Sequence, residues 1–333
     1  MNTFPLIGLG LATKGSTGKT LDTFFPKIVC KDSDEDIYSS WEMLMLGKDC
    51  VNLDPGALNI SDKALESSLD QLKNDGQVIL CKIEQDEQIK SVEEAYLKLH
   101  LLSYRLFQPN SLNLENLFNV LPNVAWTNKG PIDLDEVNSK ILESKVANVS
   151  LEINSIDKFP RLVDYIVPSG VRIADTSRVR LGAYLSEGTT VMHEGFVNFN
   201  AGTLGTAMIE GRISAGVVIG KNSDLGGGAS TMGTLSGGNK AKISVGENCL
   251  IGANAGLGIP LGNNCIVEAG LYITGGSKVE RFGENMKSLG IVKAEELASV
   301  DNLLFLRNSI TGAIEARINH KSVALNDSLH INQ

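Results

Sequence analysis

Aliphatic side chains recur at every sixth residue through the middle of the chain, from about Tyr165 to Glu280. A first column of such positions runs through Val167, Ile173, Val179, Leu185, Val191, Val197, Thr203 and Ile209. After a slip of four residues, a second column runs through Ile213, Ile219, Leu225, Ile243, Cys249, Ala255, Leu261, Val267, Ile273 and Val279. A period of six fits neither an amphipathic helix nor a simple alternating strand.

The second column is interrupted between Leu225 and Ile243. Thr231 and Gly237 fall on the repeat there, but they fill an aliphatic position poorly. The stretch GTLSGGNKAK, residues 233–242, is therefore expected to leave the repeat as a loop.

A six-residue repeat predicts a parallel β-helix, in which each hexapeptide forms a short strand and a tight turn, and three strands form one coil of about 18 residues. Glycine supports this fold, because 23 of the 34 glycines lie between Tyr165 and Glu280, where tight turns need small residues. The fold class implies a left-handed coil. Its flat faces and open ends need covering, so we expect a homotrimer packed face to face.

The flanks of the repeat predict further units, with the β-helix itself over residues 161–280. Residues 1–160 are expected to form an N-terminal α/β domain, with helices in DKALESSLDQLKND and SVEEAYLKLHLLSYRLF and a buried strand in QVILCKI. Residues 281–333 are expected to form a C-terminal extension, with a short helix in KAEELASV and strands around NLLFLRN and GAIEARIN. The predicted fold is mainly β.

Composition narrows the function classes. Hydrophobic residues make up 42% of the chain and charged residues 21%, which indicates a folded protein. The net charge of −9 argues against nucleic-acid binding, and no apolar run is long enough for a membrane span. The five cysteines form no CxxC pair, so reduced thiols in the cytoplasm are expected rather than a zinc site.

Three long motifs within the repeat suggest a family. They are MHEGFVNFNAGT, the pair MIEGR and GGGAS, and IGANAGLGIPLGNNCIVEAGLYITGG. The stretch from Phe159 to Gly276 closely resembles tetrahydrodipicolinate N-succinyltransferases of the group found in actinobacteria and some other bacteria. The likeness continues more thinly into the tail. This resemblance implies transfer of a succinyl group from succinyl-CoA to the amino group of ring-opened tetrahydrodipicolinate, in lysine and diaminopimelate biosynthesis.

Glu210, the glutamate of MIEGR, is the catalytic carboxylate that the resemblance implies. It would act either by accepting the acyl group as a mixed anhydride or as a general base. The alternative is a solvated charge on a turn. His193 is the competing base, because many hexapeptide acyltransferases use a histidine and it is the only histidine in the coil.

The resemblance also associates the glutamate of HEG, Glu194, with a metal, magnesium, at the trimer interface. The aspartate that would be its partner is replaced here by Ser177, which removes one carboxylate ligand. An interface hydrogen bond is the alternative role for Glu194.

A coenzyme A slot follows from the same resemblance. The matching positions are Arg212, Gly227, Ser230, Ala253, Glu268, Ala269 and Gly276, with Lys293, Leu306, Arg307, Asn308 and Ser309 at the phosphate end. Small residues suit such a slot because backbone N–H groups must approach the pantetheine amides closely. For any single glycine a coil turn is an equally good explanation.

The substrates carry three carboxylates, which need cationic partners. Candidates in the coil are Arg172, Arg178, Arg180 and Arg212, with surface salt bridges as the alternative role for the first three. A rival function is acetyl transfer to another amine or hydroxyl with His193 as base. A hexapeptide-repeat carbonic anhydrase would need three zinc-binding histidines, and a non-catalytic β-helix would carry a regular threonine ladder; the sequence has neither.

Overall fold

The computed structural model describes residues 3–53, 78–233 and 242–320. The chain divides into two compact units: Met1–Leu101 with Leu112–Pro160, and Leu102–Ser111 with Arg161–Gln333. The second unit therefore contains a short segment from the N-terminal half of the chain. No helix of the described residues is long and apolar enough to cross a membrane.

The first unit contains a four-stranded antiparallel sheet with the order β2-β1-β4-β3. Its strands are β1 (Leu6–Lys14), β2 (Thr20–Cys30), β3 (Cys50–Asn52) and β4 (Val78–Ile83), and its helices are α1 (Glu35–Met45), α3 (Val92–Ser103) and α4 (Leu117–Val120). The strand predicted in QVILCKI is confirmed as β4, and the helix predicted from residue 91 is confirmed as α3. The helix predicted in DKALESSLDQLKND lies outside the described residues.

Helices α1 and α3 pack on opposite faces of this sheet. Ile7 and Leu9 form a buried core with Tyr38 and Trp41 of α1. Gly8 points the other way, since a Cβ atom there would lie 2.8 Å from Leu97 of α3. The alternation of side chains along β1 therefore serves both layers.

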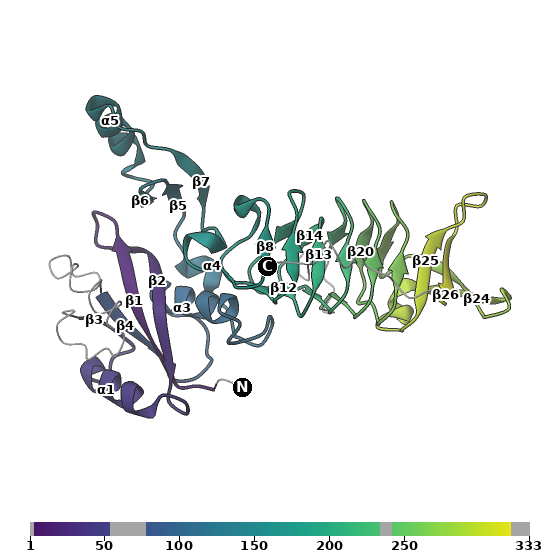
Figure 1. Ribbon diagram of the computed structural model, residues 1–333, viewed down its shortest axis with the longest axis horizontal. Coiled ribbons are helices and arrows are strands. Elements are labelled where there is room, and N and C mark those ends of the chain that lie inside the picture. Colours follow the sequence, from purple (N-terminus) through teal and green to yellow (C-terminus); the bar gives the residue numbers. More distant parts are fainter. Residues whose placement is uncertain (1–2, 54–77, 234–241, 321–333) are drawn as a thin grey trace. The chain divides into compact units, whose positions relative to one another are not determined.

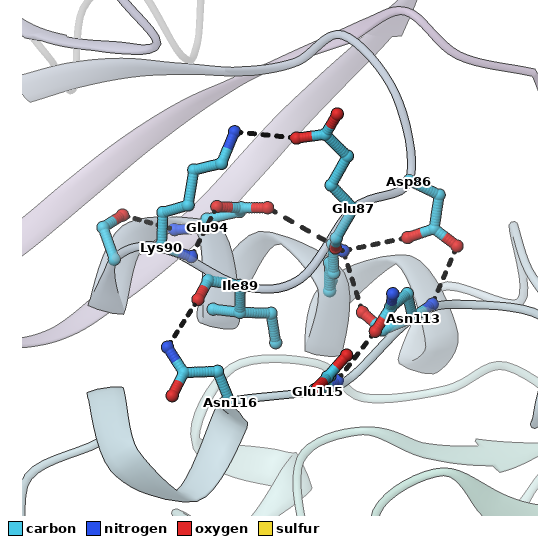
Figure 2. A network of polar contacts seen from close by, with 10 residues as sticks. Asp86, Glu87, Ile89, Lys90, Glu94, Asn113, Glu115 and Asn116 are labelled. Carbon is cyan, nitrogen blue, oxygen red and sulfur yellow. Dashed lines mark hydrogen bonds and ion pairs between the residues drawn. The ribbon is translucent and has the colours of Figure 1, made fainter.

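The side chain of Lys98, on α3, is fully buried and anchors the chain that follows β4. Its ammonium nitrogen lies 2.8 Å from Asp86 Oδ1 and donates to the carbonyl oxygens of Glu87 and Asn113 at 2.5 and 2.8 Å. Figure 2 shows this network, in which Asp86 also accepts a hydrogen bond from the Asn113 backbone at 2.7 Å. A buried charge persists only when it is paired in this way, so we read the network as structural.

A smaller sheet of the first unit has the order β6-β5-β7. Its strands are β5 (Val124–Thr127), β6 (Gly130–Asp133) and β7 (Ile153–Asp157), and helix α5 (Val137–Ala147) lies between β6 and β7 in the chain. No residue of α5 is buried, although Leu142 and Val146 are apolar.

The second unit is a parallel β-helix with three faces, and Figure 1 shows its strands stacked from β8 to β25. Face 1 contains β8 (Arg172–Ile173), β10 (Thr189–Val191), β13 (Ala207–Ile209), β16 (Asp224–Leu225), β19 (Leu250–Ile251) and β21 (Ile266–Val267). Face 2 contains β11 (Phe196–Val197), β14 (Arg212–Ile213), β17 (Ser230–Thr231), β20 (Gly256–Gly258) and β22 (Tyr272–Thr274). Face 3 contains β9 (Ala183–Leu185), β12 (Ala201–Thr203), β15 (Val218–Ile219) and β18 (Ser244–Val245). The 3-10 helices η2 (Leu162–Asp164) and η3 (Thr176–Arg178) lie before the first full coil.

The strand register confirms the first column and the slip of four. Val191 pairs with Ile173 and Ile209 on face 1, and Val197 pairs with Ile213 on face 2. Val167 does not belong to the column, because its side chain is 83% exposed in the chain before the first strand.

Part of the second column was placed wrongly. The inward strand positions are Val245, Ile251 and Leu257, whereas Ile243, Cys249 and Ala255 are buried positions two residues earlier. Thr231 is also inward and fully buried, and its hydroxyl donates to the carbonyl oxygen of Arg212 at 2.8 Å. A threonine suits the core here because its polar atom has a backbone partner. Of the predicted loop 233–242, residues 234–241 lie outside the described residues.

Asparagine takes the place of glycine at one edge of the coil. Asn222, Asn248, Asn264 and Asn302 all have positive φ values between 55° and 58° at the corner that leads to face 1. Their amides stack, with bonds from Asn222 to Asn248 at 3.3 Å and from Asn264 to Asn302 at 3.1 Å. Asparagine tolerates this left-handed conformation and adds a side-chain bond that glycine lacks.

The chain after the coil continues face 1. Strand β25 (Leu303–Arg307) pairs in parallel with β21, and β26 (Ile314–Ile318) pairs antiparallel with β25, as predicted from the two apolar runs. A hairpin that was not predicted, β23 (Lys278–Phe282) and β24 (Ser288–Lys293), completes the ten-stranded sheet. The short helix predicted in KAEELASV is a 3-10 helix, η5 (Ala294–Leu297).

Candidate active site

The outer surface of face 2 carries a row of side chains that meet across adjacent strands. The strand register aligns Phe196, Arg212, Ser230, Gly256 and Tyr272. An open cavity of about 520 Å³ follows this row; it is lined by Arg178, Glu194, Phe196, Gly211, Arg212, Gly228, Ala229, Ser230 and Tyr272. Two predicted coenzyme A contacts, Arg212 and Ser230, and the predicted metal ligand Glu194 therefore share one cavity.

The cavity has a cationic wall. Arg212 donates to the Ser230 hydroxyl from Nη2 at 2.6 Å and from Nε at 3.2 Å. Arg178 donates to the carbonyl oxygens of Glu194 and Gly195 at 3.0 and 3.3 Å. Neither arginine forms a salt bridge with a carboxylate in the described part of the chain. Each guanidinium keeps unused N–H donors for an anionic ligand.

The other two candidate arginines divide between the faces. Arg180 belongs to face 2, because the preceding residue, Val179, forms a parallel bridge with Val197 of that face. Arg180 Nη1 donates to the side-chain oxygen of Asn198 at 3.2 Å. Arg172 lies on β8 of face 1 and is exposed, so it does not belong to this cavity.

Glu210 lies at a corner between faces 1 and 2 that is unusually short. Only two residues, Glu210 and Gly211, join β13 to β14, whereas four residues join each neighbouring pair of strands at this edge. The slip of four in the hydrophobic pattern is this missing pair. The short corner is therefore recessed between longer ones, and Gly211 and Gly228 beside it line the cavity.

The backbone N–H and carbonyl groups of Glu210 are both hydrogen-bonded, but its carboxylate is not. Its N–H donates to Leu225 at 2.9 Å, and its carbonyl accepts from Gly228 at 3.1 Å. The side chain is partly buried and its carboxylate forms no hydrogen bond or ion pair with the residues that the structure describes. A partly buried carboxylate that lacks a partner in the chain is available to act on a ligand.

Most predicted coenzyme A positions stack above Glu210 along the same edge. The N–H of Asn254 donates to Gly227 at 2.9 Å, and the N–H of Gly270 donates to Ala253 at 2.8 Å, which places Gly227, Ala253 and Ala269 on successive corners. Glu268 Oε2 then accepts from the N–H of Arg307 at 2.8 Å, which places Leu306 and Arg307, at the end of β25, beside the Glu268 corner. Sequence positions almost a hundred residues apart thus form one line.

Gly227 and Gly276 are glycines for which the chain itself gives no reason. Neither has a positive φ value, and a Cβ atom on either would meet no atom within 4 Å. By contrast, a Cβ on Gly252, at the same edge, would lie 2.4 Å from the backbone nitrogen of Ala269. The absence of a side chain at Gly227 and Gly276 therefore favours something outside the chain that approaches the backbone closely.

The remaining predicted contacts are less uniform. Lys293 is exposed and lies near Gly276, because the backbone N–H of the nearby Glu295 donates to the carbonyl oxygen of Gly275. The Lys293 ammonium forms an ion pair with the Glu295 carboxylate at 3.1 Å. Asn308 is occupied inside the chain: its amide donates to Glu315 at 2.7 Å and its oxygen accepts from Ile310. Ser309 follows it in the exposed turn between β25 and β26.

His193 and Glu194 occupy the corner one coil below Glu210, and both are exposed. Ser177, another coil below, donates its hydroxyl to Asp175 at 2.6 Å. The hydrogen bonds from the Ser177 hydroxyl and backbone hold the pKa of Asp175 below its ordinary value. Among the described residues no group of three His, Cys, Asp or Glu side chains could hold a metal ion.

The sequence reasoning missed the aromatic members of the row, Phe196 and Tyr272. Tyr272 is 50% exposed and its ring lies across Gly256, where a Cβ atom would come within 2.0 Å of ring carbon Cδ1. The signal for Tyr272 is the GLG of β20 opposite the YIT of β22, but it requires the strand register to be known.

Family models match three parts of the chain. Residues 57–119 match "Tetrahydrodipicolinate N-succinyltransferase N-terminal", residues 121–161 match "Tetrahydrodipicolinate N-succinyltransferase middle", and residues 242–275 match "Hexapeptide repeat of succinyl-transferase". The likeness thus extends into the N-terminal unit, where the sequence motifs had been only general in character.

Whole-chain comparisons agree. A 2,3,4,5-tetrahydropyridine-2,6-dicarboxylate N-succinyltransferase of Vibrio cholerae is 47% identical over 344 residues and covers 98% of both chains. The enzyme of that name from Pseudomonas putida is 60% identical over 246 residues, which is 74% of this chain and 72% of its own. A crystal structure of a 2,3,4,5-tetrahydropyridine-2-carboxylate N-succinyltransferase from Campylobacter jejuni superposes with a TM-score of 0.84 at 34% identity, and covers 96% of this chain and 93% of that one.

Proposed function

Because the chain belongs to the tetrahydrodipicolinate N-succinyltransferase family, we propose that its succinyl transfer takes place in the cavity on face 2, beside Glu210. The protein is a coenzyme A-dependent acyltransferase with the left-handed parallel β-helix of hexapeptide repeats. It moves the succinyl group of succinyl-CoA to the amino group of ring-opened tetrahydrodipicolinate in lysine and diaminopimelate biosynthesis. The single observation that carries the proposed site is the alignment of Glu210 with Gly227, Ala253 and Ala269 along one edge.

This edge fits the donor. Successive coils are spaced by about 4.8 Å, so the four steps from the Glu210 corner to Leu306, near the end of β25, span roughly 19 Å. An extended pantetheine arm can run along such a line, with its thioester beside Glu210 and its phosphates toward Arg307 and Lys293. Gly227 and Gly276 leave open space for the arm at the backbone. Glu268 holds the Arg307 backbone and so shapes the distant end.

The reaction forms a C–N amide bond between the acceptor nitrogen and the succinyl carbonyl carbon, and breaks the C–S bond of the thioester. In one route Glu210 takes the proton that the attacking amine loses, and the coenzyme A thiolate is then protonated. In the other route the Glu210 carboxylate first attacks the carbonyl carbon, and the amine then displaces it from the mixed anhydride. Both routes need an accessible carboxylate without a partner in the chain.

The arginines of the cavity provide the charge complement. Arg212 begins β14 directly after the short corner that carries Glu210, so its free N–H groups can bind the succinyl carboxylate while the thioester faces Glu210. Arg178, with Arg180 near it on face 2, is placed for a carboxylate of the acceptor. The exposed His193 lies on a different coil. Acetyl transfer with His193 as base would leave these arginines without a carboxylate to bind, because an acetyl group carries none.

A magnesium ion does not fit the residues of one chain. Glu194 is exposed and only its backbone carbonyl contacts the Arg178 guanidinium, and the Ser177 hydroxyl donates its hydrogen to Asp175. Hard cations bind several oxygen ligands, and a single chain gathers too few here. We therefore derive no step through a metal, and Glu194 is proposed as an interface residue.

We also propose a homotrimer, in which a second copy covers face 2. One chain leaves the cavity open, with Tyr272 half exposed and Gly227 facing open space. Light scattering on the purified chain tests this, and a monomer that retains full activity would contradict it.

The reaction is tested by following free coenzyme A thiol from succinyl-CoA, with and without tetrahydrodipicolinate, and again with acetyl-CoA. Release that requires the acceptor and prefers succinyl-CoA is expected. Equal rates with both donors would remove the assigned role of Arg212 but leave the fold and the edge intact.

A further inference from the structure

Two cysteines of the first unit lie directly opposite each other in the sheet. Cys50 of β3 pairs with Cys81 of β4, and their Sγ atoms are 2.7 Å apart. That is closer than two sulfur atoms normally approach without a bond. The two residues are separated by 31 positions in the chain, so only the folded sheet brings them together.

The register gives this pair the spacing that a disulfide needs. The N–H of Lys82 donates to Asp49 at 2.7 Å and the N–H of Leu53 donates to Val78 at 2.8 Å, which places Cys50 and Cys81 between hydrogen-bonded pairs. At such a position the Cα atoms of antiparallel strands are about 4.5 Å apart, within the range that a disulfide bridges. No backbone movement is required for closure.

The other three cysteines are all buried, although the side chains of Cys249 and Cys265 also interact with each other. Cys30 is buried at the end of β2. Cys249 and Cys265 are fully buried in the core of the coil, where the N–H of Cys265 donates to Cys249 Sγ at 3.3 Å. Buried structural thiols are unreactive. Cys50 differs, because it is half-buried on a three-residue edge strand.

We propose that Cys50 and Cys81 form a reversible redox modification site, which closes to an intrachain disulfide by exchange with a low-molecular-weight disulfide such as oxidised glutathione. The Cys50 thiolate attacks one sulfur of the oxidant, so that a mixed disulfide forms and the first glutathione leaves. Cys81 then attacks Cys50 Sγ, so that the protein disulfide forms and the second glutathione leaves. The two cysteine protons pass to the two departing thiolates, and the glutathione disulfide is reduced as the cysteines are oxidised.

The surroundings assign Cys81 the second step. Its hydrogen bond with Cys50, its burial and the carboxylates of Glu93 and Glu94 raise the pKa of the Cys81 thiol well above its ordinary value. Cys81 therefore stays protonated until the mixed disulfide lies beside it. This inference does not depend on the acyl transfer, since all its residues belong to the first unit.

The test uses the full chain, equilibrated with mixtures of reduced and oxidised glutathione, quenched with acid and alkylated with N-ethylmaleimide under denaturing conditions. We expect the number of alkylated thiols to fall from five to three as oxidised glutathione increases, with the loss of two hydrogen atoms in mass and a peptide link between Cys50 and Cys81. Added dithiothreitol should restore all five.

Single variants fix the assignment. Cys30→Ser should form the same disulfide, whereas Cys50→Ser should form none and keep all four of its thiols alkylatable. Because Cys50 is only half-buried and lies on an edge strand, that variant is the less disruptive one, and its melting temperature is checked first; Cys50→Ala serves if it is unstable. Five alkylated thiols at every glutathione ratio, a link between other cysteines, or a stable glutathione adduct on Cys50 beside a free Cys81 would each overturn the proposal.

Discussion

Arg212 directs two N–H groups at one oxygen atom, the hydroxyl of Ser230, which faces it on the next strand of face 2. A hydroxyl held by Nε and Nη2 orients the whole plane of the guanidinium. The remaining N–H groups then point in fixed directions beside Glu210. The arginine side chain is thus ordered before any carboxylate arrives, which lowers the entropy cost of binding one.

Replacing Arg212 by lysine keeps the charge and removes this fork. We expect kcat/KM for succinyl-CoA to fall by about 10- to 100-fold, the equivalent of one hydrogen bond to a charged group, and kcat/KM for acetyl-CoA to change little. Arg172→Lys, on face 1, is the matched control and should leave both unchanged. If kcat/KM falls equally for both donors in Arg212→Lys, the arginine does not bind the succinyl carboxylate.

Ser230→Ala tests the positioning role separately. The charge of Arg212 remains, so KM for succinyl-CoA should rise severalfold while kcat stays nearly constant. Ser230→Thr, which keeps the hydroxyl, should recover most of the affinity. A loss of kcat at constant KM would contradict the assignment.

Glu210→Gln should reduce kcat by roughly two to four orders of magnitude, which is the usual contribution of a general base, with no change in melting temperature. The carboxylate has no partner among the described residues, so its loss leaves no broken network behind. Glu247→Gln, at an exposed corner of another edge, is the control. Near-normal turnover of Glu210→Gln would transfer the role to another group, with His193 the next candidate.

The two routes through Glu210 also differ in a measurable way. A mixed anhydride predicts a burst of coenzyme A release from succinyl-CoA alone, at most one per site, and capture of the acyl group by hydroxylamine. General-base catalysis predicts neither. Rapid-quench measurement of the first turnover without acceptor distinguishes them.

Gly227→Ala should raise KM for succinyl-CoA by about tenfold without lowering the melting temperature, because the added methyl group meets only open space in the chain. Gly252→Ala, at the same edge, forces a carbon against the Ala269 backbone and should lower stability by about 1–3 kcal/mol. Thermal unfolding and donor titration are measured on both. A folded Gly227→Ala enzyme with unchanged KM would remove Gly227 from the slot.

The first unit should lose stability in mild acid because of His100, which is fully buried in α3. Burial lowers the pKa of His100 from 6.5 to about 4, although a hydrogen bond to the Tyr96 carbonyl opposes this shift. Between these two values the unfolded chain binds a proton that the folded chain does not. Stability is therefore complete above the unfolded pKa and falls as the pH falls towards 4, by about 3 kcal/mol in total.

Urea unfolding between pH 7 and pH 5 measures this slope, followed by a probe of the first unit such as the fluorescence of Trp41. His100→Gln should be less stable at neutral pH, since it disturbs the bond from the Phe25 N–H, but its stability should vary less with pH. An equal slope in the variant would assign the acid sensitivity to other groups.

The hexad pattern predicts the coil well because each inward aliphatic adds to one continuous core. It misplaces Ile243, Cys249 and Ala255 because the coil also buries the position two residues before each inward one, from Ala183 onward in the described residues. Hydrophobicity alone does not distinguish these two positions after a loop whose length is not a multiple of six residues. The slip of four was visible in the sequence, but its meaning as a recessed corner at Glu210 required the strand bounds.

Contacts across strands were beyond the sequence pattern. Phe196, Arg212, Ser230, Gly256 and Tyr272 are 16, 18, 26 and 16 residues apart, so no fixed period connects them. The unequal steps reflect corners and loops of different length. The Cys50–Cys81 pair was likewise hidden, because it depends on the register between β3 and β4, which residues 53–77 separate in the chain.

The segment Leu102–Ser111 has a consequence for how the protein can be divided. Ser103 accepts the N–H of Gly182 at 2.8 Å, and the N–H of Asn110 donates to the side chain of Asn200 at 2.7 Å, so residues from the N-terminal half close the first coil. A chain truncated to begin at Arg161 would lose this plug and expose unpaired backbone at the start of the stack. Such a fragment should pair with a second copy through its opened end, which makes the interleaved connectivity a safeguard against self-association of the coil.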